Sequence, residues 1–205
     1  MDIVCLDLEG VLIPEVWINF AEKTGIEALR ATTRDVPDYD VLMQQRLKIL
    51  DEHGLKLPDI QAVIGEMGPM EGAREFLDQL RETYQVVILS DTFYDFAEPM
   101  MRQLGWPTLF CHRLEIAEDG RVANYKLRMP DQKRHSVNAF QKLNFKVMAA
   151  GDSYNDTTML GAAEAGILFR SPENVIREFP QFPHVTEYDE LAAQFRDASK
   201  RINGG

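Results

Sequence analysis

The chain has 205 residues, of which 33 are acidic and 22 basic, and its formal net charge is -11. This length suits one sizeable core with room for a small insert. Lys and Arg form no cluster, so we expect no nucleic-acid partner and no anionic membrane partner. The sequence has no apolar run of membrane-spanning length and does not begin like a signal peptide, and Cys5 and Cys111 show no metal-ligand spacing. We therefore expect a cytoplasmic protein with reduced, buried cysteines.

The first predicted element is a buried strand, and a helical block follows it. Residues 3–6 are an apolar run of the kind that is buried on both faces of a sheet. Residues 13–75 contain no convincing strand, and their apolar spacing predicts three helices. Asp38 or Asp40 can cap the second of these helices, whose apolar side is expected to carry Val41, Leu42, Leu47 and Leu50.

From residue 72 onwards, strands and helices alternate. This order is typical of an α/β fold with a parallel sheet. We expect Gly166 to end the last helix of the core. Right-handed crossovers would make the sheet doubly wound, as in Rossmann-like folds. The expected helices span 72–83, 94–104, 132–143 and 156–165, the strands span 86–89, 147–150 and 167–169, and a hairpin turns at Asp119-Gly120 between 114–116 and 122–127.

Polar residues follow three of the predicted strands. Asp7 follows the first strand, Ser90 follows the second, and Asp152 follows the strand at 147–150. Ligands of open parallel sheets bind outside the carboxyl ends of the strands, so these side chains should meet in one place. The sequence therefore predicts an acidic active site at that edge.

The two acidic strand ends fit phosphoryl transfer. A carboxylate can attack phosphorus and form an aspartyl-phosphate, and we assign that role to Asp7. Such a site needs Mg²⁺ to offset the phosphate charge, and Asp7 and Asp152 are ligands of the kind that Mg²⁺ prefers. Glu9, two residues from the nucleophile, is placed to act as general acid and base.

Other residues are candidates for binding the phosphate. Ser90 can donate a hydrogen bond to the phosphoryl oxygens, and Asn155 is either an amide facing the phosphate or a turn residue. A cation is also required. Lys133 and its neighbour Arg134 both qualify, and we favour Lys133 because an ammonium is the usual point-charge phosphate binder. Asp156 is expected to cap its helix while orienting a metal ligand or the water bound to the metal.

With these residues in place, the chain resembles the haloacid-dehalogenase superfamily at all four of its motifs. The resemblance implies an α/β core of residues 1–12 and 76–205, a helical cap of residues 13–75 that closes over the substrate, and a Mg²⁺ site involving Asp7, Glu9 and Asp152. It also places Asp91 beside Ser90 in the substrate site. The matching segments are Asp7-Leu8-Glu9-Gly10-Val11, Leu89-Ser90-Asp91-Thr92, Lys133 and Gly151-Asp152-Ser153-Tyr154-Asn155-Asp156.

Within that superfamily the chain looks most like the phosphoserine phosphatases. It is most similar to a bacterial branch that also transfers the phosphate of O-phospho-L-serine to homoserine instead of water. The resemblance implies that Glu15 holds the substrate ammonium and Arg46 its carboxylate. Glu9 stands where ordinary phosphoserine phosphatases have aspartate, and Val11 where a small hydroxyl residue is common. The closer match is carried by residues 21–26, 32–35, 37–40 and 172–180.

Simpler interpretations stand beside these. Without the resemblance, Glu15 and Arg46 would be ordinary helix-face charges. The same chemistry could serve another small phosphomonoester, and a catalytically silent interaction module is a third hypothesis. The four histidines have no ligand spacing and are expected to be surface or structural residues. The tail aromatics Phe179, Phe182 and Tyr188 suggest packing, and a homodimer is one expectation from them.

Overall fold

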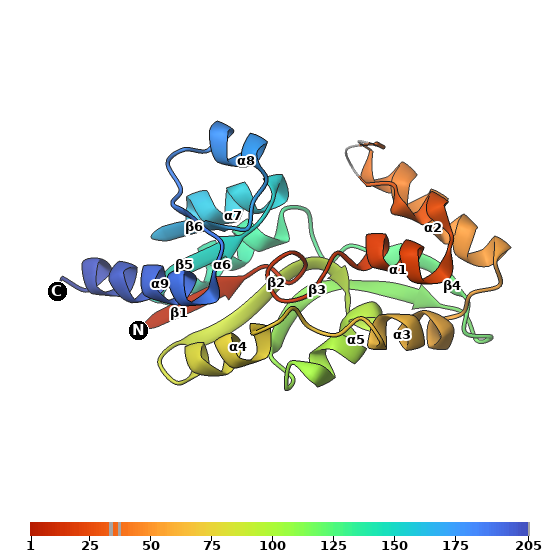
Figure 1. Cartoon of the computed structure of the whole chain (residues 1–205), viewed down its shortest axis with the longest axis horizontal. Coiled ribbons are helices and arrows are strands. Elements are labelled where there is room, and N and C mark those ends of the chain that lie inside the picture. The colour runs from red at the N-terminus through yellow and green to blue at the C-terminus, as the bar shows by residue number, and fades with distance from the viewer. Residues whose placement is uncertain (33–34, 37, 205) are drawn as a thin grey trace.

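The computed structural model describes residues 1–32, 35–36 and 38–204. Its centre is a seven-stranded sheet in the order β4-β3-β2-β1-β5-β6-β7, in which β3 and β4 are antiparallel and all other neighbours are parallel (Figure 1). This arrangement confirms the predicted α/β fold. The strands are β1 (Asp2–Leu6), β2 (Gln85–Phe93), β3 (Thr108–Ile116), β4 (Val122–Lys126), β5 (Lys146–Gly151), β6 (Ala165–Phe169) and β7 (His184–Val185).

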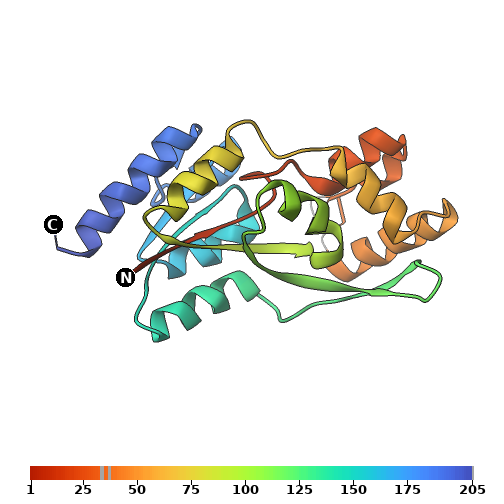
Figure 2. The ribbon, with the colours of Figure 1, turned by 90° about the horizontal axis from the view of Figure 1, so that it is seen from below.

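Helices cover both faces of the sheet. Successive strand side chains point to opposite faces. Accordingly, Val4 belongs to the buried cluster under α4 (Ala73–Arg81) and α9 (Tyr188–Ile202), which lie side by side in Figure 2. Cys5 belongs to the opposite cluster, under α6 (Gln132–Lys142) and α7 (Thr157–Ala162). The sheet is therefore doubly wound, as the sequence predicted.

A block of helices lies beyond the carboxyl end of the sheet (Figure 1). It follows β1 directly, and its helix α3 packs against α5 of the core while α2 packs against β4. These contacts hold the block against the hairpin edge of the sheet. Its elements are α1 (Val16–Thr24), the 3₁₀ helix η1 (Glu27–Arg30), α2 (Tyr39–Glu52) and α3 (Leu57–Gly65), and α5 spans Tyr94–Gln103.

The start of α2 corrects one expectation. Asp38 is the N-cap, and its side chain accepts hydrogen bonds from the backbone amides of Asp40 and Val41 at 2.9 and 3.1 Å. Val41 is 45% exposed, which is contrary to the prediction. The reason is helical periodicity: the buried residues of α2 centre on a face opposite Val41. They are Leu42, Met43, Arg46, Leu47 and Leu50.

The region around β6 corrects a second expectation. The helix predicted to reach residue 165 ends at Ala162 and is preceded by the 3₁₀ helix η2 (Tyr154–Asp156). Gly166 does not end a helix; it lies in β6 opposite Ala149. A Cβ at Gly166 would lie 2.5 Å from the carbonyl oxygen of Leu160, so close packing of α7 on the strand explains the glycine.

The C-terminal tail forms structure that the sequence did not predict. It contains the helix α8 (Glu173–Glu178), the strand β7 and the helix α9. Phe179 and Phe182 stack on each other, and Tyr188 stacks on Phe76 and Phe169. The tail aromatics therefore pack within this chain.

Two further expectations concern cysteines and membranes. Cys5 and Cys111 are both buried and both free, as predicted. Across the described residues, every helix is too short or too polar to cross a bilayer.

Candidate active site

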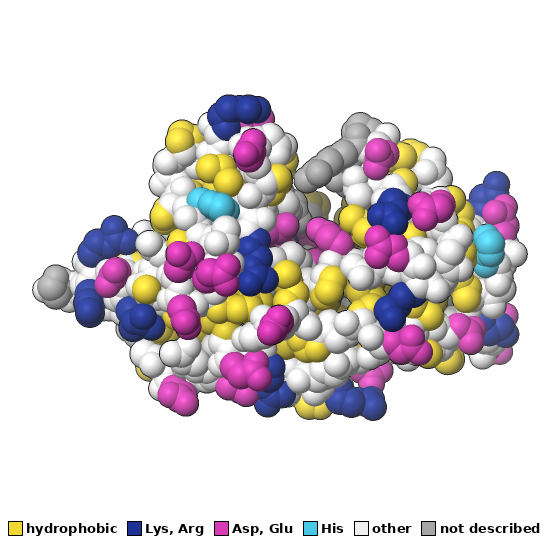
Figure 3. Space-filling model, viewed as in Figure 1, with side chains coloured by type: hydrophobic (Ala, Val, Ile, Leu, Met, Phe, Trp, Pro, Cys, Tyr) yellow, Lys and Arg dark blue, Asp and Glu magenta, His cyan; other side chains and the backbone are white. Residues whose placement is uncertain are grey.

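The three polar strand ends meet at one edge of the sheet. Strand β1 lies between β2 and β5, so Asp7 sits between Ser90 on one side and Asp152 on the other. They line a cavity of about 330 Å³, and Figure 3 shows this face hollowed near the helical block, with acidic side chains around the hollow. The cavity brings together every residue that we assigned to the site from the sequence: Asp7, Glu9, Glu15, Arg46, Ser90, Asp91, Lys133, Asp152 and Asn155.

Lys133 is the cation at the bottom of this cavity. Its side chain is buried, and its Nζ lies 2.9 Å from Asp7 Oδ1, 2.8 Å from Asp156 Oδ1 and 3.8 Å from Asp91 Oδ2. Burial alone would lower the pKa of Lys133, but the three carboxylates outweigh burial and raise it well above its usual value. The ammonium is therefore charged throughout the physiological range. Arg134 instead pairs with Asp131 outside the cavity.

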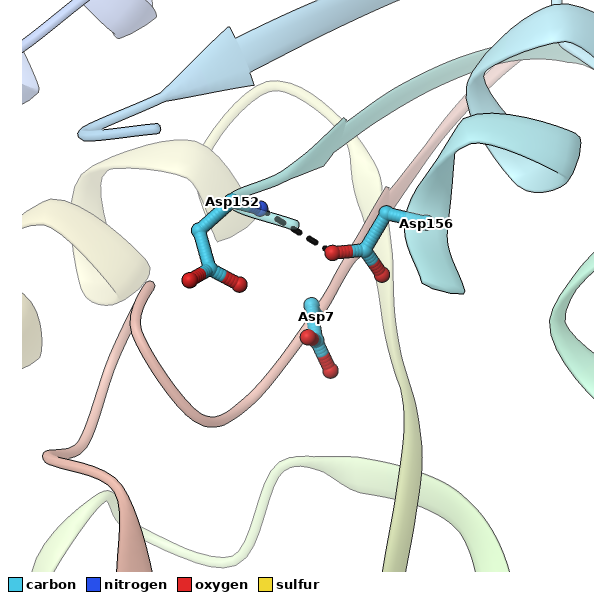
Figure 4. Close-up of side chains that lie close together, drawn as sticks. All are labelled: Asp7, Asp152 and Asp156. Atoms are coloured by element: carbon cyan, nitrogen blue, oxygen red, sulfur yellow. Dashed lines mark hydrogen bonds between the residues drawn. The ribbon is translucent and has the colours of Figure 1, made fainter. Parts of the chain in front are cut away.

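Three aspartates form a group that could hold a divalent cation. Asp7, Asp152 and Asp156 each offer a carboxylate oxygen, and these oxygens lie within 4.8 Å of one another (Figure 4). Burial, followed by the charge of Asp156, raises the pKa of Asp7 and raises that of Asp152 to about 7. The single ammonium of Lys133 cannot neutralise all of these carboxylates. Mg²⁺ takes such oxygen ligands, so the residues present fit it.

The group of three differs from the expected metal ligands, because it contains Asp156 and does not contain Glu9. Both oxygens of Asp156 are occupied: Oδ1 accepts from Lys133, and Oδ2 accepts from the amides of Asp152 and Ser153 at 3.0 and 3.1 Å. Asp156 therefore orients Lys133 and the backbone of Asp152. Glu9, which we had included among the metal ligands, has its carboxylate outside the group of three.

Glycine lets the loop after β1 approach these aspartates. Gly10 has φ +74°, and a Cβ there would lie 2.5 Å from the carboxyl carbon of Asp152. Gly151 is equally restricted, because its Cβ would lie 2.3 Å from the carboxyl carbon of Asp156. Only glycine fits at these two positions without displacing a carboxylate.

Glu9 turns towards the helical block. Its Oε2 accepts a hydrogen bond of 2.9 Å from the amide of Val16, and burial raises its pKa. Glu15 lies beside it, and its side chain is exposed. Partial burial, followed by the charge of Glu9, raises the pKa of Glu15 to about 7. Because its pKa is raised, the carboxyl group of Glu9 can hold a proton and donate it to a leaving group.

Arg46 faces the cavity from α2. It is 7% exposed, its guanidinium lies 4.4 Å from the centre of the Trp17 ring, and its Nη2 donates to the carbonyl of Ala31 at 2.8 Å. Its Nε is buried and has no hydrogen-bond partner within the described part of the chain. Burial lowers the pKa of Arg46 to about 10, which leaves it charged at neutral pH. A guanidinium that stays charged at a cavity wall is suited to binding an anion.

Two buried residues without a recognisable sequence signal support Ser90 and Asp91. Gln132 Nε2 donates to the carbonyl of Ser90 at 2.8 Å. His112 accepts a hydrogen bond from the amide of Arg128 at Nδ1, so its other nitrogen carries the proton and faces Asp91 Oδ1 at 3.6 Å. His112 is thus a buried structural histidine, and neither its spacing nor its neighbours in sequence indicated this position.

Asp91 is a charged member of the cavity wall. Burial alone would raise its pKa, but Lys133, His112 and Asn155 together hold the pKa well below the usual range. Asn155 Nδ2 donates to Asp91 Oδ2 at 3.1 Å, so the amide of Asn155 is turned to a carboxylate. Asp91 is therefore ionised at neutral pH.

Part of the closer resemblance lies outside the described residues. Thr33, Arg34 and Pro37 belong to the segments that carry it, and they are not among the residues the structure describes. Glu22, in another of these segments, pairs with Arg30 at 2.9 Å on the surface of the helical block. We assign no part of the cavity to these positions.

Comparisons with known proteins agree with this geometry. The profile of a family described as haloacid dehalogenase-like hydrolase matches residues 1–164. A Pseudomonas aeruginosa protein named phosphoserine phosphatase ThrH is 69% identical over 201 residues, which are 98% of this chain and 98% of that protein. A Pseudomonas syringae pv. tomato protein named phosphoserine phosphatase is also 69% identical over 201 residues, 98% of this chain and 85% of that protein.

Solved structures share the fold. A phosphoserine phosphatase from T. onnurineus gives a TM-score of 0.66 at 26% identity, covering 93% of this chain and 92% of that one. A structure described as a phospho-aspartyl intermediate analogue of phosphoserine phosphatase gives 0.72 at 19% identity, covering 91% and 93%, and at that identity it shows the fold alone. The family match, the two relatives and the shared fold lead to one conclusion: this chain belongs to the haloacid dehalogenase-like hydrolases.

Proposed function

We propose that the protein is a Mg²⁺-dependent phosphoserine phosphatase that acts through an aspartyl-phosphate on Asp7. The observation that carries this proposal is the cavity itself, because Asp7, Lys133, Arg46 and Glu15 all line it. The first two suit a phosphate, and Arg46 and Glu15 suit the carboxylate and the ammonium of an amino acid. The names of the two relatives at 69% identity support the same substrate.

The first step is attack of Asp7 on phosphorus. Leu8 and Lys133 both contact Asp7 Oδ1, at 2.7 and 2.9 Å, so we assign the attack to Oδ2. The bond from phosphorus to the serine oxygen breaks, and Glu9 gives its proton to that oxygen. Ser90 and Lys133 bind the phosphoryl oxygens, whose charge they offset. Mg²⁺ held by Asp7 and Asp152 would neutralise further phosphate charge when bound.

The second step returns Asp7 to its starting state. Glu9, now a carboxylate, takes a proton from water, and the water oxygen attacks phosphorus. The bond from phosphorus to Asp7 breaks, and inorganic phosphate leaves. The same base can deprotonate the hydroxyl of an alcohol.

We propose homoserine as that second acceptor, which would yield O-phosphohomoserine. This part of the proposal rests on the closer resemblance and on Glu9, which is one methylene longer than the aspartate of ordinary phosphoserine phosphatases. The longer side chain changes the reach of the acid and base.

We also propose that the helical block of residues 13–75 is the cap over the substrate. Arg46, Glu15 and Trp17 all come from it and line the cavity. Helix α4, which packs against the sheet, begins at Ala73. The rims of the cavity therefore belong to two parts of the chain.

The test follows phosphate, serine and O-phosphohomoserine after incubation with phosphoserine. With Mg²⁺ we expect release of serine and phosphate, loss of both with EDTA, and appearance of O-phosphohomoserine when homoserine is added. If no serine is released in the presence of Mg²⁺, phosphoserine is not the substrate. Turnover of a generic alkyl phosphate without turnover of phosphoserine would support the alternative of another small phosphomonoester.

Location and assembly stay predictions. We place the protein in the cytoplasm because Cys5 and Cys111 are buried and free, as is usual in a reducing compartment. The expected homodimer finds no support in Phe179, Phe182 and Tyr188, because these aromatics pack within the chain. Light scattering coupled to size-exclusion chromatography measures the oligomeric state directly.

A further inference from the structure

The loop after β1 carries Glu9 and has two carbonyl groups bound from outside it. Within the loop, the amide of Gly10 donates to the carbonyl of Ile13 at 2.8 Å, and the amide of Leu12 donates to that of Leu8 at 2.8 Å. The carbonyl of Leu12 accepts from the amide of Met70 at 3.0 Å. The carbonyl of Val11 accepts from the hydroxyl of Tyr188, at 2.6 Å, across 177 positions of sequence.

Tyr188 is itself held firmly. Its ring stacks on Phe76 of α4 at 4.7 Å and on Phe169 of β6 at 5.1 Å, measured between ring centres. The guanidinium of Arg170 lies 4.9 Å from the same ring, and its Nε donates to the carbonyl of Thr186 at 2.7 Å. Because core elements fix the ring on several sides, the hydroxyl is a fixed point for the loop.

The loop has little freedom on its other side. Gly10 packs against the carboxylate of Asp152 so closely that no Cβ fits, and Glu9 lies one residue before it. Val11 is fully buried, so its carbonyl has no access to bulk water. A shift of the loop at Val11 therefore changes the position of Glu9 relative to Asp7, and small misplacements of a catalytic group cost much of the rate.

We propose that Tyr188 is a positioning residue for the reaction, fixing through Val11 the loop that aims Glu9 at the leaving group. The proposal gives the C-terminal tail a part in catalysis. Tyr188 lies beyond residues 1–164, the part of the chain that the family profile matches. The proposal rests on the proposed phosphatase activity and on the role of Glu9 as its general acid.

The test compares Tyr188→Phe with a matched control, Tyr94→Phe. Tyr94 donates an equally short hydrogen bond of 2.6 Å to a backbone carbonyl, that of Leu109, and it does not line the cavity. Each variant loses one hydroxyl and keeps its ring. Thermal unfolding of both variants shows whether the two losses have similar structural costs.

The readout is the dependence of kcat/KM on the leaving group. Phosphoserine needs its leaving oxygen protonated, whereas p-nitrophenyl phosphate releases a stable phenolate without help. We expect Tyr188→Phe to lower kcat/KM for phosphoserine roughly tenfold, a small part of what a general acid contributes. Its kcat/KM for p-nitrophenyl phosphate, and both values for Tyr94→Phe, should change by less than about twofold.

Equal losses with the two esters, or no loss in a folded Tyr188→Phe, would overturn the proposal. Should wild-type protein cleave glycerol 2-phosphate and not phosphoserine, the proposed substrate fails, and glycerol 2-phosphate replaces it as the alkyl ester in the same comparison. Hydrogen exchange of the wild-type protein is a second test that needs no variant. We expect strong protection from exchange, equal to that of the β1 amides, at the amides of Gly10, Leu12 and Ile13. Rapid exchange at these amides would overturn the proposal that the loop is held in place.

Discussion

Substitution of Arg46 tests the assignment of the amino-acid end of the cavity. The guanidinium is largely buried and lines the cavity, so a substrate carboxylate bound there would be a charged acceptor for its hydrogen bonds. A hydrogen bond to a charged group contributes about 1.5–3 kcal/mol. Since about 1.4 kcal/mol corresponds to a factor of ten, Arg46→Ala should raise KM for phosphoserine roughly 10- to 150-fold.

The assay needs a substrate without a carboxylate and a control arginine. KM for p-nitrophenyl phosphate should change little in Arg46→Ala, because that ester has no group for Arg46 to bind. Arg46→Lys keeps the charge and loses the planar fork, so its KM for phosphoserine should lie between wild type and Arg46→Ala. Arg113 also lies over an aromatic ring, 5.3 Å from the centre of Tyr94, and it does not line the cavity. Arg113→Ala should leave both KM values unchanged.

One result would refute this reasoning. An equal rise of KM for both esters in Arg46→Ala would mean that Arg46 acts on the phosphate or on the fold. Thermal unfolding separates those two cases, because Arg46 also packs on Trp17 and binds the carbonyl of Ala31. A normal unfolding midpoint with an equal rise of both KM values would mean that a residue other than Arg46 binds the substrate carboxylate.

Two other substitutions have matched controls. Lys133→Met removes the ammonium between buried carboxylates, so we expect it to abolish turnover and to lower the free energy of unfolding by about 3–5 kcal/mol. In denaturant unfolding, the free energy of unfolding of Arg134→Ala should stay within about 0.5 kcal/mol of the wild-type value. Equal stabilities of the two variants would contradict the buried pairing. Gly10→Ala puts a Cβ against Asp152, so the Mg²⁺ concentration for half-maximal activity should rise at least tenfold, on the order of one lost ligand interaction. Gly25→Ala carries similar backbone strain, since Gly25 has φ +70°, but its added Cβ would have nothing within 4 Å. This control should keep the wild-type Mg²⁺ requirement. An equal rise of the Mg²⁺ requirement in Gly25→Ala would mean that backbone strain causes the effect.

The site could be predicted from local patterns because parallel strands end at the same edge of a sheet. Apolar runs located β1, β2 and β5, and the residues after them had to converge once the sheet was parallel. Family resemblance supplied Glu15 and Arg46, whose types and spacing alone look like ordinary helix charges. The helical block followed from periodicity, apart from Val41, which is exposed because it lies opposite the buried face of α2.

What could not be predicted depends on contacts between distant positions. Gln132 binds the carbonyl of Ser90 across 42 positions, and Tyr188 binds that of Val11 across 177. A backbone carbonyl leaves no mark in a sequence, so neither partner was visible. Gly166 was misread for a related reason: the signal for a helix end and the signal for close packing on a strand are the same residue.

The central claim is that Asp7 becomes phosphorylated. The most direct measurement mixes the protein rapidly with radiolabelled phosphoserine and Mg²⁺, quenches in acid within the first turnover, and maps the label by mass spectrometry. We predict label on the peptide that contains Asp7, faster loss of that label when homoserine is added, and no label on folded Asp7→Asn. Turnover without a labelled peptide, or label on a peptide that lacks Asp7, would contradict the mechanism.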